Sequence, residues 1–141
     1  MIKFKFLEHK ADVKFQAFGN SIEEAFKNSA LAMISIFLNS KIKVKNIIDK
    51  KIKIQGKDLE SLLYNFLEEF LFLLDSEQFL ASKITKIKIK KEKSFYTLWA
   101  EICGDKSENY EISGDVKAVT YNQMFVKKQG NKFITQVVLD V

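Results

Sequence analysis

The sequence predicts an α+β protein, with a mostly antiparallel β-sheet and two long α-helices packed on it. Several segments alternate apolar and polar residues with a period of two, which is typical of strands with one buried face. Two longer segments repeat apolar residues at helical spacing. Short turns join most of the strand segments, and parallel pairing would need long crossovers, so antiparallel pairing is expected.

The first helix is predicted to follow two short strands. Residues 2–7 and 13–18 alternate in the strand pattern, with the short polar segment 8–12 between them. Gly19 ends the second strand. Asn20 or Ser21 can then cap a helix that continues to about residue 38, because both side chains can accept a hydrogen bond from the first helical turn.

The middle of the chain alternates Lys with Ile or Val. This pattern predicts strands at residues 41–45 and 51–54, around a turn at residues 46–50. Asp58 can begin a second helix, whose apolar stripe continues to Leu74. Phe72 and Leu73 widen that stripe, so the helix is expected to be covered on more than one side.

Four further strands are predicted in the last third of the chain: residues 84–91, 95–104, 120–128 and 132–140. Gly130 and Asn131 suit a hairpin turn between the last two. The order strand-helix-strand-strand would then occur twice, over residues 13–54 and from residue 52 onward. An internal duplication is therefore an alternative that the sequence leaves open.

Length and composition indicate one domain spanning residues 1–141. The chain is 47% apolar, contains no proline and has few glycines, so nothing in it resembles a linker. The amino-terminal residues lack the apolar core of a signal peptide, and no apolar run approaches the roughly 20 residues of a membrane span. We expect a cytoplasmic protein without a membrane partner.

The net charge of +5 arises entirely from lysine, since arginine is absent. Arginine supplies the planar fork used for bidentate contacts to phosphate and guanine, so its absence argues against sequence-specific readout of nucleic acid. Lysine still neutralises phosphates. A basic RNA-binding module is therefore retained as an alternative function. In that alternative the tyrosines would stack on bases if exposed, whereas Trp99 is expected in the core.

The residue inventory excludes several kinds of catalytic site. A single Cys and a single His cannot build a thiolate or histidine zinc cage. The chain has no Gly-rich phosphate loop, no HExxH and no GxSxG motif. No nucleophile has an evident base, so we expect no enzymatic activity. A hydrolase that uses a metal-activated water remains a minor alternative.

Acidic groups at two places could form a cation site. Asp12 closes the turn between the first two strands, and Asp140 precedes the terminal carboxylate of Val141 at the end of the last strand. Like charges so close together are unfavourable unless a cation or a lysine neutralises them. Three oxygen donors would suit Ca²⁺ or Mg²⁺. From these residues alone, a turn cap and a frayed terminus are the simpler interpretation.

The chain also resembles the archease family. The resemblance rests on segments in order along the whole sequence: Glu8-His9-Lys10-Ala11-Asp12, residues 17–33, residues 58–69, residues 116–121 and Leu139-Asp140-Val141. It implies an accessory protein that activates an RtcB-type RNA ligase in tRNA splicing or RNA repair. Such a protein promotes guanylation of the ligase and multiple turnover, and would meet RNA through the ligase.

The resemblance also implies a site for a divalent cation at Asp12, Asp140 and the Val141 carboxylate. Ca²⁺ is the expected ion, with Mg²⁺ or Mn²⁺ as alternatives. His9 and Lys117 are candidates for contacts to the partner or around the metal. The sequence departs from the family pattern at Lys10, where a small hydroxyl residue is common, and at Asn122, where a His is frequent.

Overall fold

The structure, a computed structural model, describes residues 2–9, 11–38 and 41–141. It confirms the predicted α+β class. In chain order the elements are β1 (Phe4–Leu7), β2 (Val13–Gly19), α1 (Ile22–Phe37), β3 (Ile48–Gly56), α2 (Leu59–Glu77), β4 (Phe79–Lys91), β5 (Tyr96–Lys106), the short 3₁₀-helix η1 (Ser107–Asn109), β6 (Ala118–Gln129) and β7 (Lys132–Asp140).

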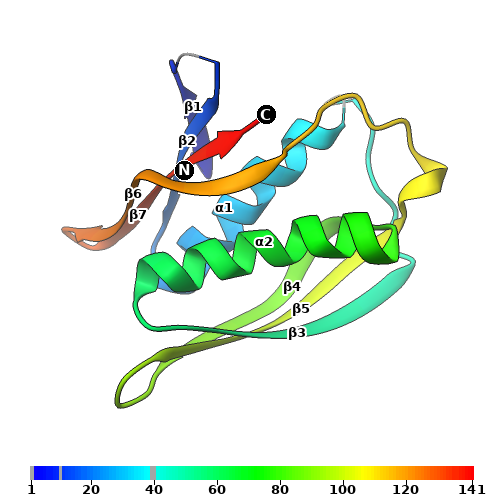
Figure 1. Ribbon diagram of the computed structural model, residues 1–141. Helices are drawn as coiled ribbons and strands as arrows, with labels where there is room; N and C mark the ends of the chain where they lie inside the picture. Colours follow the sequence, from blue (N-terminus) through cyan, green and yellow to red (C-terminus); the bar gives the residue numbers. More distant parts are fainter. Residues whose placement is uncertain (1, 10, 39–40) are drawn as a thin grey trace.

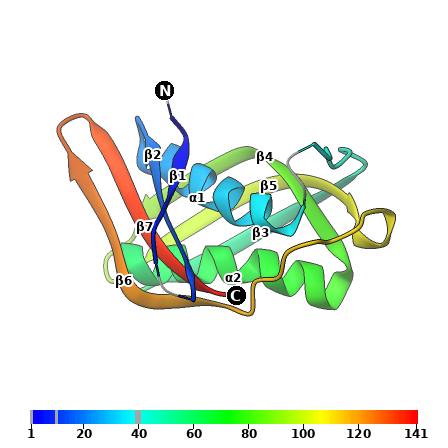
Figure 2. The ribbon, with the colours of Figure 1, turned by 90° about the horizontal axis from the view of Figure 1, so that it is seen from above.

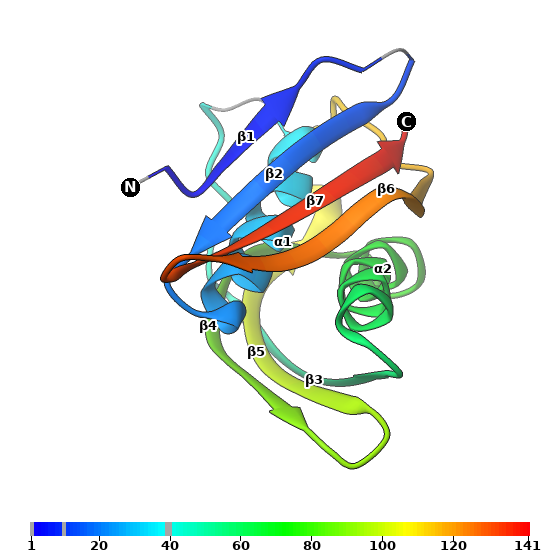
Figure 3. The ribbon, with the colours of Figure 1, turned by 90° about the vertical axis from the view of Figure 1, so that its left-hand side faces the viewer.

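The strands form two antiparallel sheets with the helices between them (Figures 1 and 3). One sheet has the order β1-β2-β7-β6 and the other the order β3-β5-β4. Helix α1 contacts β2 and β7 on one side and β4 on the other, while α2 contacts β6 and β3. The strands are thus divided between two sheets instead of forming the single sheet expected. The prediction that the second helix is covered on more than one side is confirmed.

Both helices begin as their capping residues predict. The Ser21 side chain accepts a hydrogen bond from the Glu24 amide, and the Glu24 carboxylate accepts one from the Asn20 amide. Asp58 caps α2 in the same way, accepting from the Ser61 amide at 2.7 Å. This hydrogen bond is the largest cause that lowers the pKa of Asp58.

The predicted strand at residues 41–45 is wrong. Residues 41–47 form no strand, and β3 begins at Ile48, inside the turn predicted at residues 46–50. A side chain explains the difference: the Lys45 amide donates to the Tyr110 hydroxyl at 2.8 Å. That hydroxyl donates in turn to the carboxylate of Asp105. Among the described residues, the strand-helix-strand-strand order therefore lacks a strand in the first half of the chain and occurs only as β3-α2-β4-β5.

Two aromatic residues expected in apolar surroundings are exposed. Trp99 lies between the buried Leu98 and Ala100 on β5, and alternation along the strand turns its side chain outward, where 37% of it is exposed. Phe72, on α2, is 52% exposed. The apolar run in that helix is therefore wider than the surface that the two sheets cover.

Strand β7 lies inside its sheet, with β2 on one side and β6 on the other. The buried hydroxyl of Ser29, on α1, donates to the Ala25 carbonyl and lies 2.7 Å from the hydroxyl of Thr135 on β7. A serine hydroxyl has one hydrogen to donate, so Thr135 is the donor in the second contact. These bonds hold the last strand, and with it the C-terminus, against the first helix.

Among the residues that the structure describes, no helix is both long and apolar enough to cross a membrane. The cytoplasmic location stays a prediction.

We predict that Tyr110→Phe lowers the urea midpoint at neutral pH, because it removes the hydroxyl that links Asp105 to Lys45. The hydrogen bond from Tyr110 is the largest cause of the lowered pKa of Asp105. A lowered pKa contributes stability above the ordinary value of 3.8, and this contribution is lost as the pH falls through the folded-state pKa. The difference between the midpoints of variant and wild type should therefore shrink in strong acid, leaving the part that comes from the lost Lys45 hydrogen bond. A constant difference between pH 7 and pH 3 would contradict this account.

Candidate metal and partner site at the C-terminus

The pairing of β2 with β7 brings the two predicted acidic residues together. Val13 is the partner of Leu139 in this antiparallel pair. Asp12 comes directly before Val13 and Asp140 directly after Leu139, so the two aspartates stand opposite each other at the end of the ladder. They come from opposite ends of the chain, yet they are neighbours in the fold.

Both aspartates belong to the outer face of the four-stranded sheet. Val13 and Leu139 face the helices, and Leu139 is completely buried. Because side chains alternate along a strand, the neighbouring Asp12 and Asp140 point the other way. Asp140 is exposed and Asp12 partly exposed. Both carboxylates are therefore accessible from solvent.

The terminal residue lies at the same end of the sheet. The C-terminus and the β1–β2 turn come together there, as Figures 2 and 3 show. The Val141 side chain packs against the hydrophobic core. The amide of Lys117 donates to the Asp140 carbonyl at 2.7 Å, so the chain is held as far as Asp140 on the β6 side and as far as Leu139 on the β2 side. The Lys117 side chain is exposed next to it.

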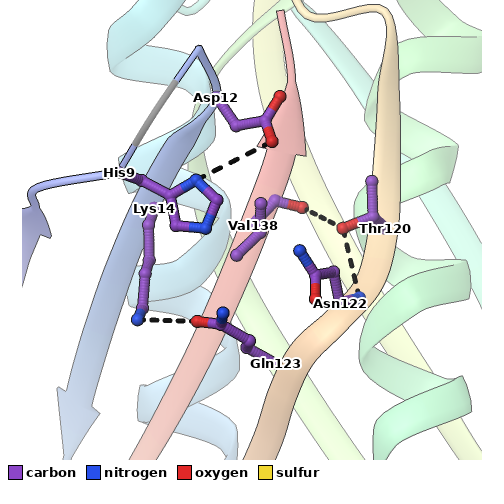
Figure 4. A network of polar contacts seen from close by, with 7 residues as sticks. All are labelled: His9, Asp12, Lys14, Thr120, Asn122, Gln123 and Val138. Carbon is purple, nitrogen blue, oxygen red and sulfur yellow. Dashed lines mark hydrogen bonds and ion pairs between the residues drawn. The ribbon is translucent and has the colours of Figure 1, made fainter.

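His9 also reaches this region. Its Nδ1 lies 3.7 Å from an Asp12 carboxylate oxygen, which forms an ion pair when the imidazole is protonated (Figure 4). The turn closes through Ala11, which has a φ of 59°, a conformation uncommon for residues other than glycine. Lys10, where the sequence departs from the family pattern, lies outside the described part of the chain.

A wide bulge in β6 covers the outer face beside the aspartates. Thr120 is paired with Val138 and Phe125 with Gln136, so four residues of β6 lie opposite a single residue of β7. The Thr120 hydroxyl donates to the Val138 carbonyl at 2.7 Å and accepts from the Asn122 amide at 3.3 Å (Figure 4). Consistent with this cover, Val138 is only 1% exposed.

Gln123 links the bulge to the neighbouring strands. It has a φ of 56°, its side-chain oxygen accepts from Lys14 on β2, and its carbonyl accepts from Gln136 on β7. No sequence motif selects Gln123, Lys14 or Gln136 for the site. For Lys14 the available signal was its place between the apolar residues Val13 and Phe15, but that signal becomes useful only once the strand pairing is known.

The predicted donor set contains oxygen atoms only. Within the described ranges, no group of three or more His, Cys, Asp or Glu side chains could hold a metal ion. The predicted set is of another kind, because it combines two Asp side chains with the main-chain carboxylate of Val141. Carboxylate oxygens at an exposed edge fit a hard cation such as Ca²⁺ and do not fit the nitrogen and sulfur preference of zinc.

Comparison with known proteins identifies the family. The Archease protein family (MTH1598/TM1083) matches residues 4–141. A protein named archease from Methanosarcina mazei is 36% identical over 141 residues, covering 99% of this chain and 96% of the relative. The chain belongs to the archease family. The resemblance inferred from the sequence motifs is thereby confirmed.

Solved structures of the family share this fold. The solution structure of protein 1598 from Methanobacterium thermoautotrophicum is 34% identical, with a TM-score of 0.84 and 99% of both chains covered. A crystal structure from Thermotoga maritima, described as an archease and possible chaperone, is 20% identical with a TM-score of 0.62. It covers 97% of this chain and 96% of its own, and at this identity it supports the fold alone.

We predict that Thr120→Val loosens the bulge of this archease-family protein. The change removes both hydrogen bonds of the hydroxyl and should cost about 1 kcal/mol of unfolding free energy. It should also speed amide hydrogen exchange at Asn122. Thr120→Ser keeps the hydroxyl and is the matched control. If both variants exchange at the wild-type rate, the hydroxyl does not hold the bulge.

Proposed function

We propose that this protein is a non-enzymatic accessory factor that binds a divalent cation and activates an RtcB-type RNA ligase. Family membership supports an accessory role, and the observation that carries the cation is the register that sets Asp12 opposite Asp140. The Thermotoga maritima protein is described as a possible chaperone, which is compatible with action on a partner protein. None of the relatives named above is described as a catalyst.

In this proposal Asp12, Asp140 and the Val141 carboxylate hold the cation. Each contributes oxygen, and all three belong to one exposed edge of the sheet. A bound Ca²⁺ would neutralise the carboxylates and offer its remaining coordination positions to oxygen atoms of a partner. Hydrogen bonds on both sides of β7 keep the C-terminal donors ordered before any partner binds, which lowers the entropic cost of binding.

We call the end of the sheet that carries Asp12, Asp140 and the Val141 carboxylate the acidic edge. Groups around the acidic edge would complete the contact with the ligase. The exposed Lys117 lies next to Asp140 and can pair with an acidic group of a partner. His9 lies against Asp12 and can help to orient its carboxylate. Both are proposed as contact or supporting residues, and neither is assigned a chemical step.

We predict that Ca²⁺ raises the melting temperature of the chelator-treated protein. A ligand at 100 times its Kd stabilises the folded state by about 2.7 kcal/mol. This shift should be lost in Asp12→Asn and Asp140→Asn. Asp75→Asn is the matched control, since it makes the same change at an exposed position near the end of α2. An equal Ca²⁺ shift in all four proteins would show that the ion binds elsewhere.

We further predict that the wild-type protein stimulates guanylation of its cognate ligase in the presence of GTP and metal, by at least tenfold over Asp12→Asn or Asp140→Asn. A third variant adds one glycine after Val141. It leaves the side chains unchanged but moves the terminal carboxylate one residue further along the chain, so it should also lose stimulation. The readout is labelled guanylate bound covalently to the ligase.

Separate outcomes test the two parts of the proposal. Stimulation by the wild type, by Asp75→Asn and by all the acidic-edge variants would support the partner and exclude the cation site from the mechanism. Stimulation by none of the proteins, with a ligase that is competent for guanylation, would exclude the partner.

A further inference from the structure

The three-stranded sheet and the four-stranded sheet that carries Asp12 and Asp140 lie on opposite sides of the two helices (Figure 3). The outer face of the three-stranded sheet is therefore a separate surface of the molecule. Its core-facing residues Leu98, Ala100 and Ile102 are buried. The alternate residues of β5, among them Trp99 and Glu101, point away from the helices. This face has no part in the function proposed above.

Trp99 occupies the centre of this face. It lies on the middle strand, with Lys53 of β3 as its partner on one side and Lys88 of β4 on the other. The Lys53 ammonium is 5.9 Å from the centre of the indole ring, and 37% of Trp99 remains exposed. A large aromatic ring is thus presented to solvent between two cations.

Lysines surround this tryptophan on both edge strands. The strand registers place six of them on the outer face, opposite Trp99 or its alternate neighbours on β5: Lys51, Lys53, Lys83, Lys86, Lys88 and Lys90. Among the described residues, the carboxylates of Asp49 and Glu101 lie between these lysines, and Glu101 is paired with Lys86 at 3.6 Å. The face therefore carries a clear excess of positive charge.

The surface is also hollowed beside the indole ring. An open cavity of about 670 Å³ is lined by residues of all three strands, among them Lys51, Lys88, Trp99 and Glu101. It combines an aromatic wall with cationic rims. A nucleic-acid strand matches both features, because its bases can stack on the aromatic wall while its phosphates contact the lysines.

Protection of the sheet edges explains only part of this arrangement. Lysines on β3 and β4 discourage pairing of these edge strands with other chains. That role needs no exposed tryptophan on the middle strand, where there is no edge to protect. Stacking of a base on an aromatic ring, beside a cationic track for the backbone, accounts for the tryptophan and the lysines together.

We propose that the outer face of the β3-β5-β4 sheet, centred on Trp99 and flanked by Lys53 and Lys88, binds single-stranded RNA. Trp99 stacks on one base, and the lysines neutralise the neighbouring phosphates without reading the sequence. The choice of RNA as the nucleic acid rests on the proposed action on an RNA ligase. The stacking site itself rests on the chemistry of this face.

Trp99 is the single tryptophan of the chain, so its fluorescence reports directly on the proposed contact. We predict that a twelve-nucleotide oligouridylate quenches this fluorescence, without ligase, GTP or added metal. Log affinity should fall with log salt by about 0.7 per phosphate neutralised. Polyphosphate at equal charge should bind without the quenching that stacking produces.

Variants separate stacking from charge, using labelled oligouridylate and fluorescence anisotropy. Trp99→Ala should weaken binding roughly tenfold, and Trp99→Phe less, because phenylalanine retains a ring on which a base can stack. The double variant Lys53→Glu/Lys88→Glu should weaken binding at least tenfold and flatten the salt dependence. The matched control, Lys127→Glu/Lys128→Glu, reverses two exposed charges on β6 of the other sheet and should bind within about twofold of wild type.

Several results would overturn this proposal. The first is that oligouridylate does not quench Trp99 fluorescence at low salt, and the second is that polyphosphate quenches it equally. The third is that the two double lysine variants lose equal affinity for oligouridylate. Quenching of Trp99 by the ligase but not by RNA would instead assign this face to a protein partner. Asp12→Asn should bind RNA as the wild type does, so failure of the cation proposal and failure of this one give different results.

Discussion

The position of the last strand is the constraint on which the rest of the structure depends. Strand β7 is bonded to β2 and β6 along almost its whole length and is fixed to α1 through Ser29 and Thr135. A terminal strand at the edge of a sheet could fray without much loss. Here the final residues close the four-stranded sheet, so β2 and β6, which come from opposite ends of the chain, meet only through β7. Folding of this sheet must therefore include its most distant contacts.

The same constraint determines where carboxylates can gather. An antiparallel partner of β7 begins where β7 ends, so the turn before β2 must lie beside the C-terminus. Asp12, Asp140 and the Val141 carboxylate share one edge for this reason, without any local motif that joins them. Val141 also packs on the core, so in the proposed site this one residue would combine apolar packing with presentation of a carboxylate.

How much the sequence predicts depends on how local each feature is. Helix caps at Ser21 and Asp58, the hairpin at Gly130 and the bounds of β7 follow from a few adjacent residues, and all agree with the structure. The segment at residues 41–45 has strand periodicity, but its Lys45 amide is satisfied by the distant Tyr110. The division into two sheets and the β6 bulge depend likewise on pairings that alternation alone does not specify. For the site, positions at strand ends and the motif resemblance both indicated the acidic residues, while their proximity required the register.

The layered architecture makes two separate surfaces possible. The acidic edge belongs to one sheet and the lysine-flanked tryptophan to the other, with the helix layer between them (Figure 3). A polyanion is repelled by the carboxylates and attracted by the lysines, so separating them prevents each surface from weakening the other. An RNA strand held at Trp99 would consequently not be the same stretch of RNA that lies next to the cation. If both proposals hold, the protein would touch a ligase with one sheet and a flanking region of RNA with the other, and substitutions on the two faces should act independently.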